Sequence, residues 1–451
     1  MTNALVRYGL PAYMLLCLVA GGSAQGVWAN FALQLLALAM LAALALSNDR
    51  GGQPAALGGL PRIGIAFLAL VLVELIPLPP ALWDALPGRA FIADGFDLLH
   101  LTRPWMAWSL APVASIATLF PLLVPLAVVA AVLRRRAVRP YLLIAAMVLG
   151  TLLGILLGFL QLRSGTEVWY LYRYSAFGQA SGFFANSNHM GSLLLVNIPF
   201  LAALAADQFE RRKDMSQRGL VLGGAVGLAF ILVIAVALNH SLAVLLLGGP
   251  VVLLSLAIPS WHRPGVRKGL ALVAVAALAA SVALGAAQGK FAVASQESSI
   301  QTRSAIWATS LDAISDFRLT GSGLGTFERV QRHYENPDTV DPTYVNHAHN
   351  DYLEIAVELG LPGLALVALF LLWWARRAAA AWRPAEGNVY ARAASIASAT
   401  LLVHSLVDFP LRTAAIAALF GMCLGLLCVR MAPAPTDQRK QLWSPRHRTI
   451  G

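Results

Sequence analysis

The sequence predicts an all-α, polytopic integral membrane protein with about 12 transmembrane helices and one large loop on the non-cytoplasmic side. The first observation is composition: 58% of the 451 residues are hydrophobic and only 12% are charged, whereas a soluble chain needs roughly 25% charged residues to cover its surface. The second is the length of the apolar runs, which approach the roughly 20 residues that cross a bilayer. The third is that Lys and Arg gather in every second connection, as they do in cytoplasmic loops.

Twelve apolar runs along the chain are the expected membrane spans. Basic clusters follow the fourth, sixth, eighth and tenth runs, so both termini are expected in the cytoplasm. The net charge of +11 therefore reflects topology and gives no reason to expect nucleic-acid binding. The three cysteines lie inside apolar runs without metal-ligand spacing and are expected to be buried and free. The spans are expected at residues 8–24, 27–47, 61–80, 112–133, 140–161, 189–206, 220–238, 241–259, 269–288, 355–375, 392–407 and 411–430.

With this orientation, residues 81–111, 162–188 and 289–349 lie outside the cytoplasm. The third segment is far longer than an ordinary connection, and long loops tend to carry function. Within it, Ser304–Phe317 has the apolar spacing of an amphipathic helix. The stretch Gly321–Gly325 should end that helix; it follows no strand and lacks a Lys-Ser/Thr end, so it is not expected to bind a nucleotide.

The densest polar cluster stands where the tenth span begins. It contains His347, His349, Asn350 and Asp351, and Asn350 or Asp351 is a suitable N-cap. Because a helix N-terminus offers unpaired N–H groups and a positive dipole end, this place suits an anionic group such as a phosphate. The two histidines can transfer protons near neutral pH. Alternation of His347, His349 and Asp351 would also allow a metal site, although residues that enter a helix seldom keep such geometry.

A second cluster, with Asn186, Asn188 and His189, leads into the sixth span in the same way. If the two helix starts are neighbours, they form a polar, positively biased pocket at the membrane surface. A simple capping role is the alternative for these residues. Ionisable residues in membranes are often functional, so His404 with Asp408 could relay protons or could bridge helices. Glu74, in the third expected span, could likewise be functional or structural. Candidate cations in the outer layer are Arg163, Arg173, Arg303, Arg318, Arg329 and Arg332.

Five motifs, taken in order, resemble the O-antigen ligase and O-antigen polymerase superfamily. They are Gly182–His189, Arg303 with Trp307, Gly321–Phe327, His347–Glu354 with Glu358–Gly360, and His404–Leu411. The resemblance covers roughly residues 160 to 430. It implies N-terminal transmembrane helices over residues 1–160, an O-antigen ligase-like transmembrane region over 161–430 that includes the periplasmic loop 289–349, and a basic cytoplasmic tail over 431–451.

The resemblance also implies an activity. Such proteins are metal-independent glycosyltransferases of the bacterial inner membrane that need no cofactor and act at the periplasmic face on glycans carried by undecaprenyl diphosphate. The family's loop histidine falls on His349 as the base, and its loop arginine on Arg303. Substrate-binding roles are expected for Arg173, Asn186, Asn188, His347 and Asn350. Many members have an arginine where this chain has Gln179, and Arg173 could supply that charge instead.

The acceptor is the least determined part of this expectation. Ligases use a hydroxyl of the lipid A core, polymerases use the end of another repeat unit of O-antigen or exopolysaccharide, and related oligosaccharyltransferases use a protein hydroxyl. Ligation to lipid A core is the first choice here. A polysaccharide transporter or flippase is the alternative from a different class, but it should bind at the bilayer midplane through internal repeats and broken helices. The sequence shows no convincing repeat, and its polar clusters lie at helix ends.

Overall fold

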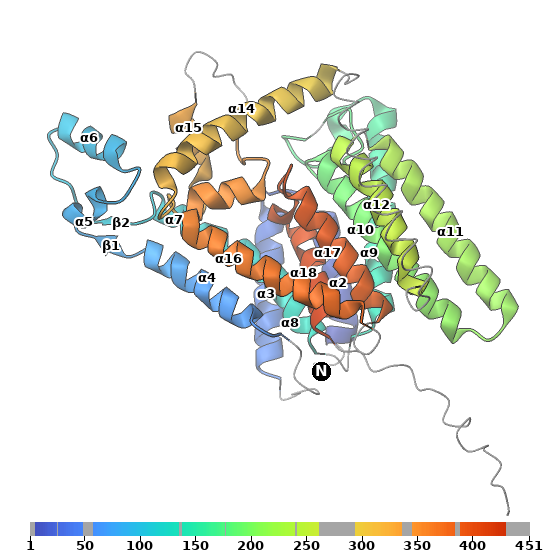
Figure 1. Ribbon diagram of the computed structural model, residues 1–451. Helices are drawn as coiled ribbons and strands as arrows, with labels where there is room; N and C mark the ends of the chain where they lie inside the picture. Colours follow the sequence, from blue (N-terminus) through green and yellow to red (C-terminus); the bar gives the residue numbers. More distant parts are fainter. Residues whose placement is uncertain are drawn as a thin grey trace, which may run out of the picture.

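The computed structural model describes residues 5–24, 26–47, 57–134, 138–175, 177–239, 241–260, 294–335, 345–383 and 388–429. The regular secondary structure of this part of the chain is helical, apart from one pair of two-residue strands. The helices form a bundle, and α14 (Ala294–Phe317) lies across one end of it together with α15 (Phe327–Tyr334) (Figure 1). The helix expected at Ser304–Phe317 is therefore confirmed, and it extends back to Ala294.

Seven helical segments within the described residues are long and apolar enough to cross a membrane. The ninth expected span, 269–288, and the tail 431–451 lie outside the described residues, so the number of twelve spans stays a prediction. The first, eleventh and last expected spans correspond to shorter helices: α2 (Leu10–Ala20) after the turn Leu5–Gly9, α17 (Val389–His404), and α18 (Ala414–Cys428). The seven segments are α3 (Trp28–Ala45), α7 (Pro112–Leu119) continued through Phe120–Leu122 into α8 (Leu123–Val132), α9 (Pro140–Ser164), α10 (Ser187–Arg211), α11 (Met215–Leu238), α12 (Leu242–Ser260) and α16 (Asp351–Ala381).

The centre of the bundle is α10, which packs against α9, α11, α12 and α17. Small side chains allow this close approach, since α17 buries Ala393, Ala394 and Ala397 completely. Such residues are typical of helix interfaces in membranes, where packing replaces the hydrophobic effect. The free cysteines Cys17, Cys423 and Cys428 are buried, as expected.

The third expected span, 61–80, is too long. The helix α4 covers only Leu60–Glu74, because the prolines at 77, 79 and 80 cannot continue the hydrogen-bond ladder. Pro77–Leu78 instead forms β1, which pairs antiparallel with β2 (Met106–Ala107). Between these strands lie α5 (Pro80–Asp84) and α6 (Ala90–Leu98), which project sideways beyond α4 (Figure 1).

The tenth expected span, 355–375, is helical but not continuous. Gly360 has φ 55° and ψ −148°, which breaks α16 into a short first segment and a long second one. The glycine-rich turn after α14 binds the backbone freed at this break: the N–H groups of Ser322 and Gly323 donate to the carbonyls of Val357 and Glu358 at 3.0 and 2.8 Å. The break is therefore a built feature, and it separates the polar start of α16 from its apolar remainder.

Candidate active site

The starts of α10 and α16 are both closed by asparagine side chains. Asn186 accepts from the N–H of Asn188 at 2.9 Å. Asn350 accepts from the N–H groups of Tyr352 and Leu353 at 3.0 and 3.1 Å. An amide oxygen at the N-cap satisfies donors that have no partner within the helix. The expected capping at Asn350 is thus confirmed, and it fixes the direction in which the preceding residues leave the helix.

One carboxylate, that of Asp408, joins the two helix starts. It lies in the turn between α17 and the short 3-10 helix Pro410–Arg412 and is fully buried. The amide nitrogens of Asn188 and Asn186 donate to its Oδ2 at 2.5 and 3.4 Å, and its Oδ1 accepts the N–H of Phe409 at 2.9 Å. The two polar clusters of the sequence are therefore neighbours.

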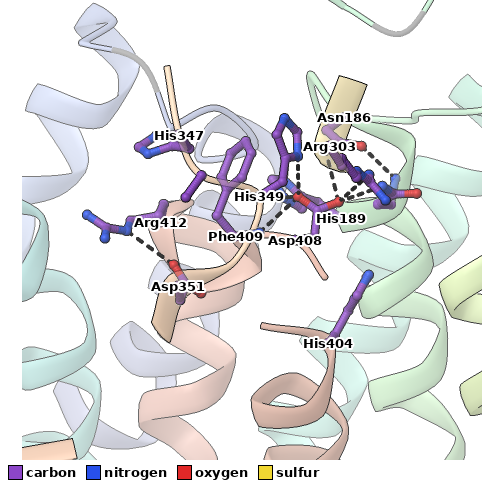
Figure 2. Close-up of polar contacts among 12 residues, drawn as sticks. Asn186, His189, Arg303, His347, His349, Asp351, His404, Asp408, Phe409 and Arg412 are labelled. Atoms are coloured by element: carbon purple, nitrogen blue, oxygen red, sulfur yellow. Dashed lines mark hydrogen bonds and ion pairs between the residues drawn. The ribbon is translucent and has the colours of Figure 1, made fainter. Parts of the chain in front are cut away.

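Three cationic or ionisable side chains also face Asp408 (Figure 2). His349 places Nδ1 3.4 Å from Oδ1, and His189 places Nε2 3.7 Å from the same oxygen. Arg303, which comes from α14, lies 3.6 Å from Oδ2. Burial by itself would raise the pKa of the Asp408 carboxyl, but the imidazoles of His189 and His349 beside it outweigh burial and hold this pKa well below its usual value. Asp408 is consequently an anion that gathers side chains from three other parts of the chain.

His349 has a backbone conformation that side chains rarely adopt. Its φ is +49°, and non-glycine residues in this region are held there by their surroundings, often at functional sites. Its side chain is 26% exposed and that of Arg303 is 23% exposed. Because Nδ1 of His349 is directed at Asp408, Nε2 lies on the opposite edge of the ring. A carboxylate that orients one ring nitrogen while the other can take a proton is the arrangement of a general base.

A second ion-pair network lies beside the first. Arg412 is 3.2 Å from Asp351 and 3.1 Å from Glu354, and Glu354 also meets Nδ1 of His347 at 2.9 Å. Burial would lower the pKa of the Arg412 guanidinium, but the carboxylates of Glu354, Glu358 and Asp351 outweigh burial and raise it. Arg412 is thus a permanent cation that is already matched by acids, and this network ties the first segment of α16 to the turn after α17.

The ring of Phe409 stands between the two networks (Figure 2). Its centroid is 4.4 Å from that of His347, 4.9 Å from that of His349 and 5.2 Å from that of His189. The three imidazoles therefore share one apolar neighbour, while His189 and His349 face Asp408 and His347 faces Glu354. In the part of the chain that the structure describes, no three His, Cys, Asp or Glu side chains are grouped as ligands of a metal ion.

The structure brings most of the site residues expected from the sequence together. His349, Arg303, Asn186 and Asn188 all contact Asp408, whereas His347 belongs to the second network and Asn350 acts as a cap. Arg173 is different. It is exposed, with its guanidinium 5.5 Å over the ring of Tyr174, and it makes none of the contacts that define the two networks.

Three further positions that the sequence singled out have defined contacts. Gln179, at the place of the family arginine, accepts a hydrogen bond from the hydroxyl of Ser187 at the start of α10. Nδ1 of His404 lies 2.7 Å from the hydroxyl of Ser192, a contact that bridges α17 to α10. Glu74 accepts the N–H of Leu324 at 3.0 Å, which holds the glycine-rich turn rather than the site.

Sequence reasoning missed the central position of Asp408 and the roles of Glu354 and Arg412. A signal was present, since Asp408 and Arg412 lie four residues apart where the eleventh expected span ends and the twelfth begins. Charges at such a place need partners, but the sequence does not say which ones.

Part of the chain matches a known family. Residues 226–368 match the model of a family described as O-antigen ligase. The matched region includes Arg303, His347, His349 and Asn350, and the resemblance to the O-antigen ligase-like superfamily is thereby confirmed. No curated protein matches the chain.

Proposed function

Because the chain carries an O-antigen ligase segment at residues 226–368, we propose that it is a membrane glycosyltransferase that moves an undecaprenyl-diphosphate-linked oligosaccharide to an acceptor hydroxyl at the periplasmic face. The observation that carries this proposal is the convergence of His349 and Arg303 on the buried Asp408, with both side chains partly open to the outside. This convergence supports roles for His349 as the base and for Arg303 as the cation that meets an anionic leaving group. The lipid A core is the proposed acceptor.

The reaction needs a base for the acceptor and a cation for the leaving group. Nε2 of His349 takes the proton of the acceptor hydroxyl as its oxygen bonds to the anomeric carbon of the donor sugar. The bond between that carbon and the diphosphate oxygen breaks, and the diphosphate leaves with the electron pair. Arg303 stabilises the developing negative charge, and its planar fork matches paired phosphate oxygens. Asp408 stabilises the imidazolium that forms on His349, and the proton then passes to the released diphosphate or to water.

The other expected substrate-binding residues keep more limited roles in this proposal. Asn186 and Asn188 hold Asp408 in place, while Asn350 holds the helix start that follows His349. His347 presents its ring beside Phe409 at the edge of the site. Arg173 contacts the ring of Tyr174 and makes none of the contacts to Asp408 described above, so an unchanged Michaelis constant for the donor in Arg173→Ala would remove it from the proposal.

Arg303 also gives the proposal a reason to do without a metal. In many phosphate-transferring sites a divalent ion neutralises the leaving group, and here the guanidinium takes that task. A polymerase that joins O-antigen or exopolysaccharide repeats, or a protein oligosaccharyltransferase, would use the same donor-side chemistry. These alternatives differ only in the acceptor, which the site residues do not select.

The deciding experiment is transfer in vitro with purified protein in sealed proteoliposomes and a synthetic undecaprenyl-diphosphate oligosaccharide. Lipid A core, an unrelated protein or no acceptor is added in separate reactions, with and without EDTA. His349→Ala and Arg303→Ala should abolish transfer, whereas His333→Ala, on α15 and stacked on Phe91, should not. Product on lipid A core supports the ligase, and a ladder of longer lipid-linked glycans without acceptor would make the protein a polymerase. Donor flipping without transfer in any reaction would favour the transporter.

A further inference from the structure

Residues 76–107, which we call the side unit, form a small structure beside the bundle. The unit contains β1, α5, α6 and β2, and it projects beyond α4 at the end of the bundle where α14 and α15 lie (Figure 1). It is firmly attached. Arg89 donates to the carbonyl of Trp108 at 2.6 Å, and the ring of Phe91 stacks on that of His333 at 4.1 Å. Its position is therefore set by the fold, although the proposed transfer reaction does not use it.

The outer edge of the side unit carries large apolar side chains that nothing in the chain covers among the described residues. Leu98 is 80% exposed, and Leu99 and Trp105 are each 67% exposed. Leu101 and Leu82 are also more than half exposed. Such a group is unusual on a surface that faces water, and large exposed apolar patches mark contact with a protein or a membrane.

The backbone holds these side chains in place. At the end of α6, His100 adopts φ +52° and the N–H of Leu101 donates to the carbonyl of Phe96 at 3.0 Å, which is the hydrogen bond of a Schellman cap. Arg103 then pairs with Asp84 and with Asp97, the latter at 2.5 Å. The cap fixes the start of the loop between Leu98 and Trp105, and the ion pairs of Arg103 fix its end. The exposed leucines are therefore held on the outer side of the unit.

The apolar edge is continuous along the chain with the exposed face of α4. That helix packs on α16 and leaves Ile65, Leu68 and Leu72 exposed, followed by Ile76 at the start of the side unit. In a membrane protein, lipid covers the exposed apolar face of such a helix. Lipid that covers the exposed face of α4 would therefore also reach the apolar edge of the side unit.

Charge and composition favour a particular position in the membrane. The ionised side chains of the unit are Asp84, Asp94, Asp97, Arg89 and Arg103. Arg89 is buried and Arg103 is matched by two acids, so no basic surface is left to select anionic headgroups. Tryptophan is typical of the boundary between headgroups and acyl chains.

We propose that the side unit lies in the membrane interface, on the same side as the candidate site, with Leu98, Leu99, Leu101 and Trp105 inserted among the lipids. The interaction is apolar and does not depend on anionic lipid. A second loop supports this position of the membrane interface. Its residues Val168, Leu171 and Tyr174, which precede α10, are apolar or aromatic and also mostly exposed. The proposal is independent of the transfer reaction.

Depth-dependent fluorescence quenching tests the proposal. The three native cysteines are buried, so Leu99→Cys can be labelled with an environment-sensitive dye in full-length protein, reconstituted in phosphatidylcholine nanodiscs. Arg329→Cys, on the exposed face of α15, is the matched control, and Trp105→Cys is a second position in the side unit. Lipids that carry a nitroxide near the headgroup should quench the dye at residue 99 about threefold more than the dye at residue 329. The same ratio is expected with added anionic lipid and in high salt.

Other results would overturn the proposal. A blue-shifted dye that nitroxide lipids do not quench would show that a second copy or another protein covers the edge. An unshifted, unquenched dye at both 99 and 105 would show that the edge faces water. Quenching that requires anionic lipid, or that disappears in high salt, would replace apolar insertion with charge attraction.

Discussion

Replacing Asp408 by asparagine is the most informative single change, because this carboxylate is the meeting point of the candidate site. The Asp408→Asn side chain would keep the size of the original and could still accept from Asn188. It would remove the negative charge that faces His349 at 3.4 Å and Arg303 at 3.6 Å. In the proposed reaction, the imidazolium that forms on His349 would then have no counter-charge. We therefore expect a slower chemical step and little change in acceptor binding.

The size of the effect follows from these distances. Two unit charges at such a separation interact by about 4 kcal/mol when the effective dielectric constant is near 20. Since His349 and Arg303 are 26% and 23% exposed, solvent screens part of this interaction, and about 2 to 3 kcal/mol remains. At about 1.4 kcal/mol for each factor of ten, kcat should fall by about 30- to 150-fold.

The assay is single-turnover transfer with saturating donor, which separates the chemical step from binding and release. Asp207→Asn is the matched control. Asp207 also pairs with an arginine, Arg211 at 2.9 Å, and accepts from the Tyr390 hydroxyl at 2.8 Å, but it lies near the opposite end of α10. A variant at Asp408 that stays folded and keeps kcat within threefold of the wild type would refute the role assigned to this carboxylate.

Three further predictions follow from the same structure. Arg303→Ala should lower kcat about 100-fold or more, while Arg303→Lys, which keeps the charge but loses the planar fork, should lower it about tenfold. Gly360→Ala should destabilise the protein by at least about 2 kcal/mol in thermal unfolding, since φ is +55° and a Cβ would lie 2.7 Å from the N–H nitrogen of Gly321. The stability that wild type gains over Asp408→Asn should be constant above about pH 5 and shrink below about pH 4, because a folded-state pKa below the unfolded value stabilises only while the carboxyl is ionised.

Each of these predictions has its own control. Equal losses in Arg303→Lys and Arg303→Ala would show that charge is not what the site requires at this position. Gly223→Ala, where a Cβ meets nothing within 4 Å, should leave thermal unfolding unchanged, and equal effects at 223 and 360 would contradict the argument from the break in α16. If the stability difference between wild type and Asp408→Asn grew as the pH fell, the pKa of Asp408 would be raised and not lowered by folding, which would contradict the prediction.

The sequence predicted the helices well and their ends less well. Hydropathy reports which side chains prefer lipid, so it placed α9, α10 and α16 correctly. It does not report backbone hydrogen bonds, and for that reason the third span was carried past Glu74 and the tenth through Gly360. Signals for both breaks were present, since prolines follow Glu74 closely and Pro362 follows Gly360.

The site was predictable in its parts but not in its arrangement. Asparagine and histidine at the starts of two helices can be recognised from local rules, and the resemblance to a family singled out His349 and Arg303. That Asn186 and Asp408 touch depends on the packing of residues separated by 222 positions. No local pattern carries such information, and so Asp408 was interpreted as a relay or a bridge and not as the centre.

The turn from Asp408 to Arg412 supplies a partner to both ion-pair networks, and this has a consequence for biosynthesis. The other members, on α10, α14 and the start of α16, leave the ribosome earlier, since chains are made from the N-terminus. Until the hairpin of α17 and α18 enters the membrane, His349 has no Asp408 and Glu354 has no Arg412. The nascent protein therefore holds an incomplete site, and under the proposed mechanism the lipid-linked donor would meet an ordered base only when insertion of this last hairpin is complete.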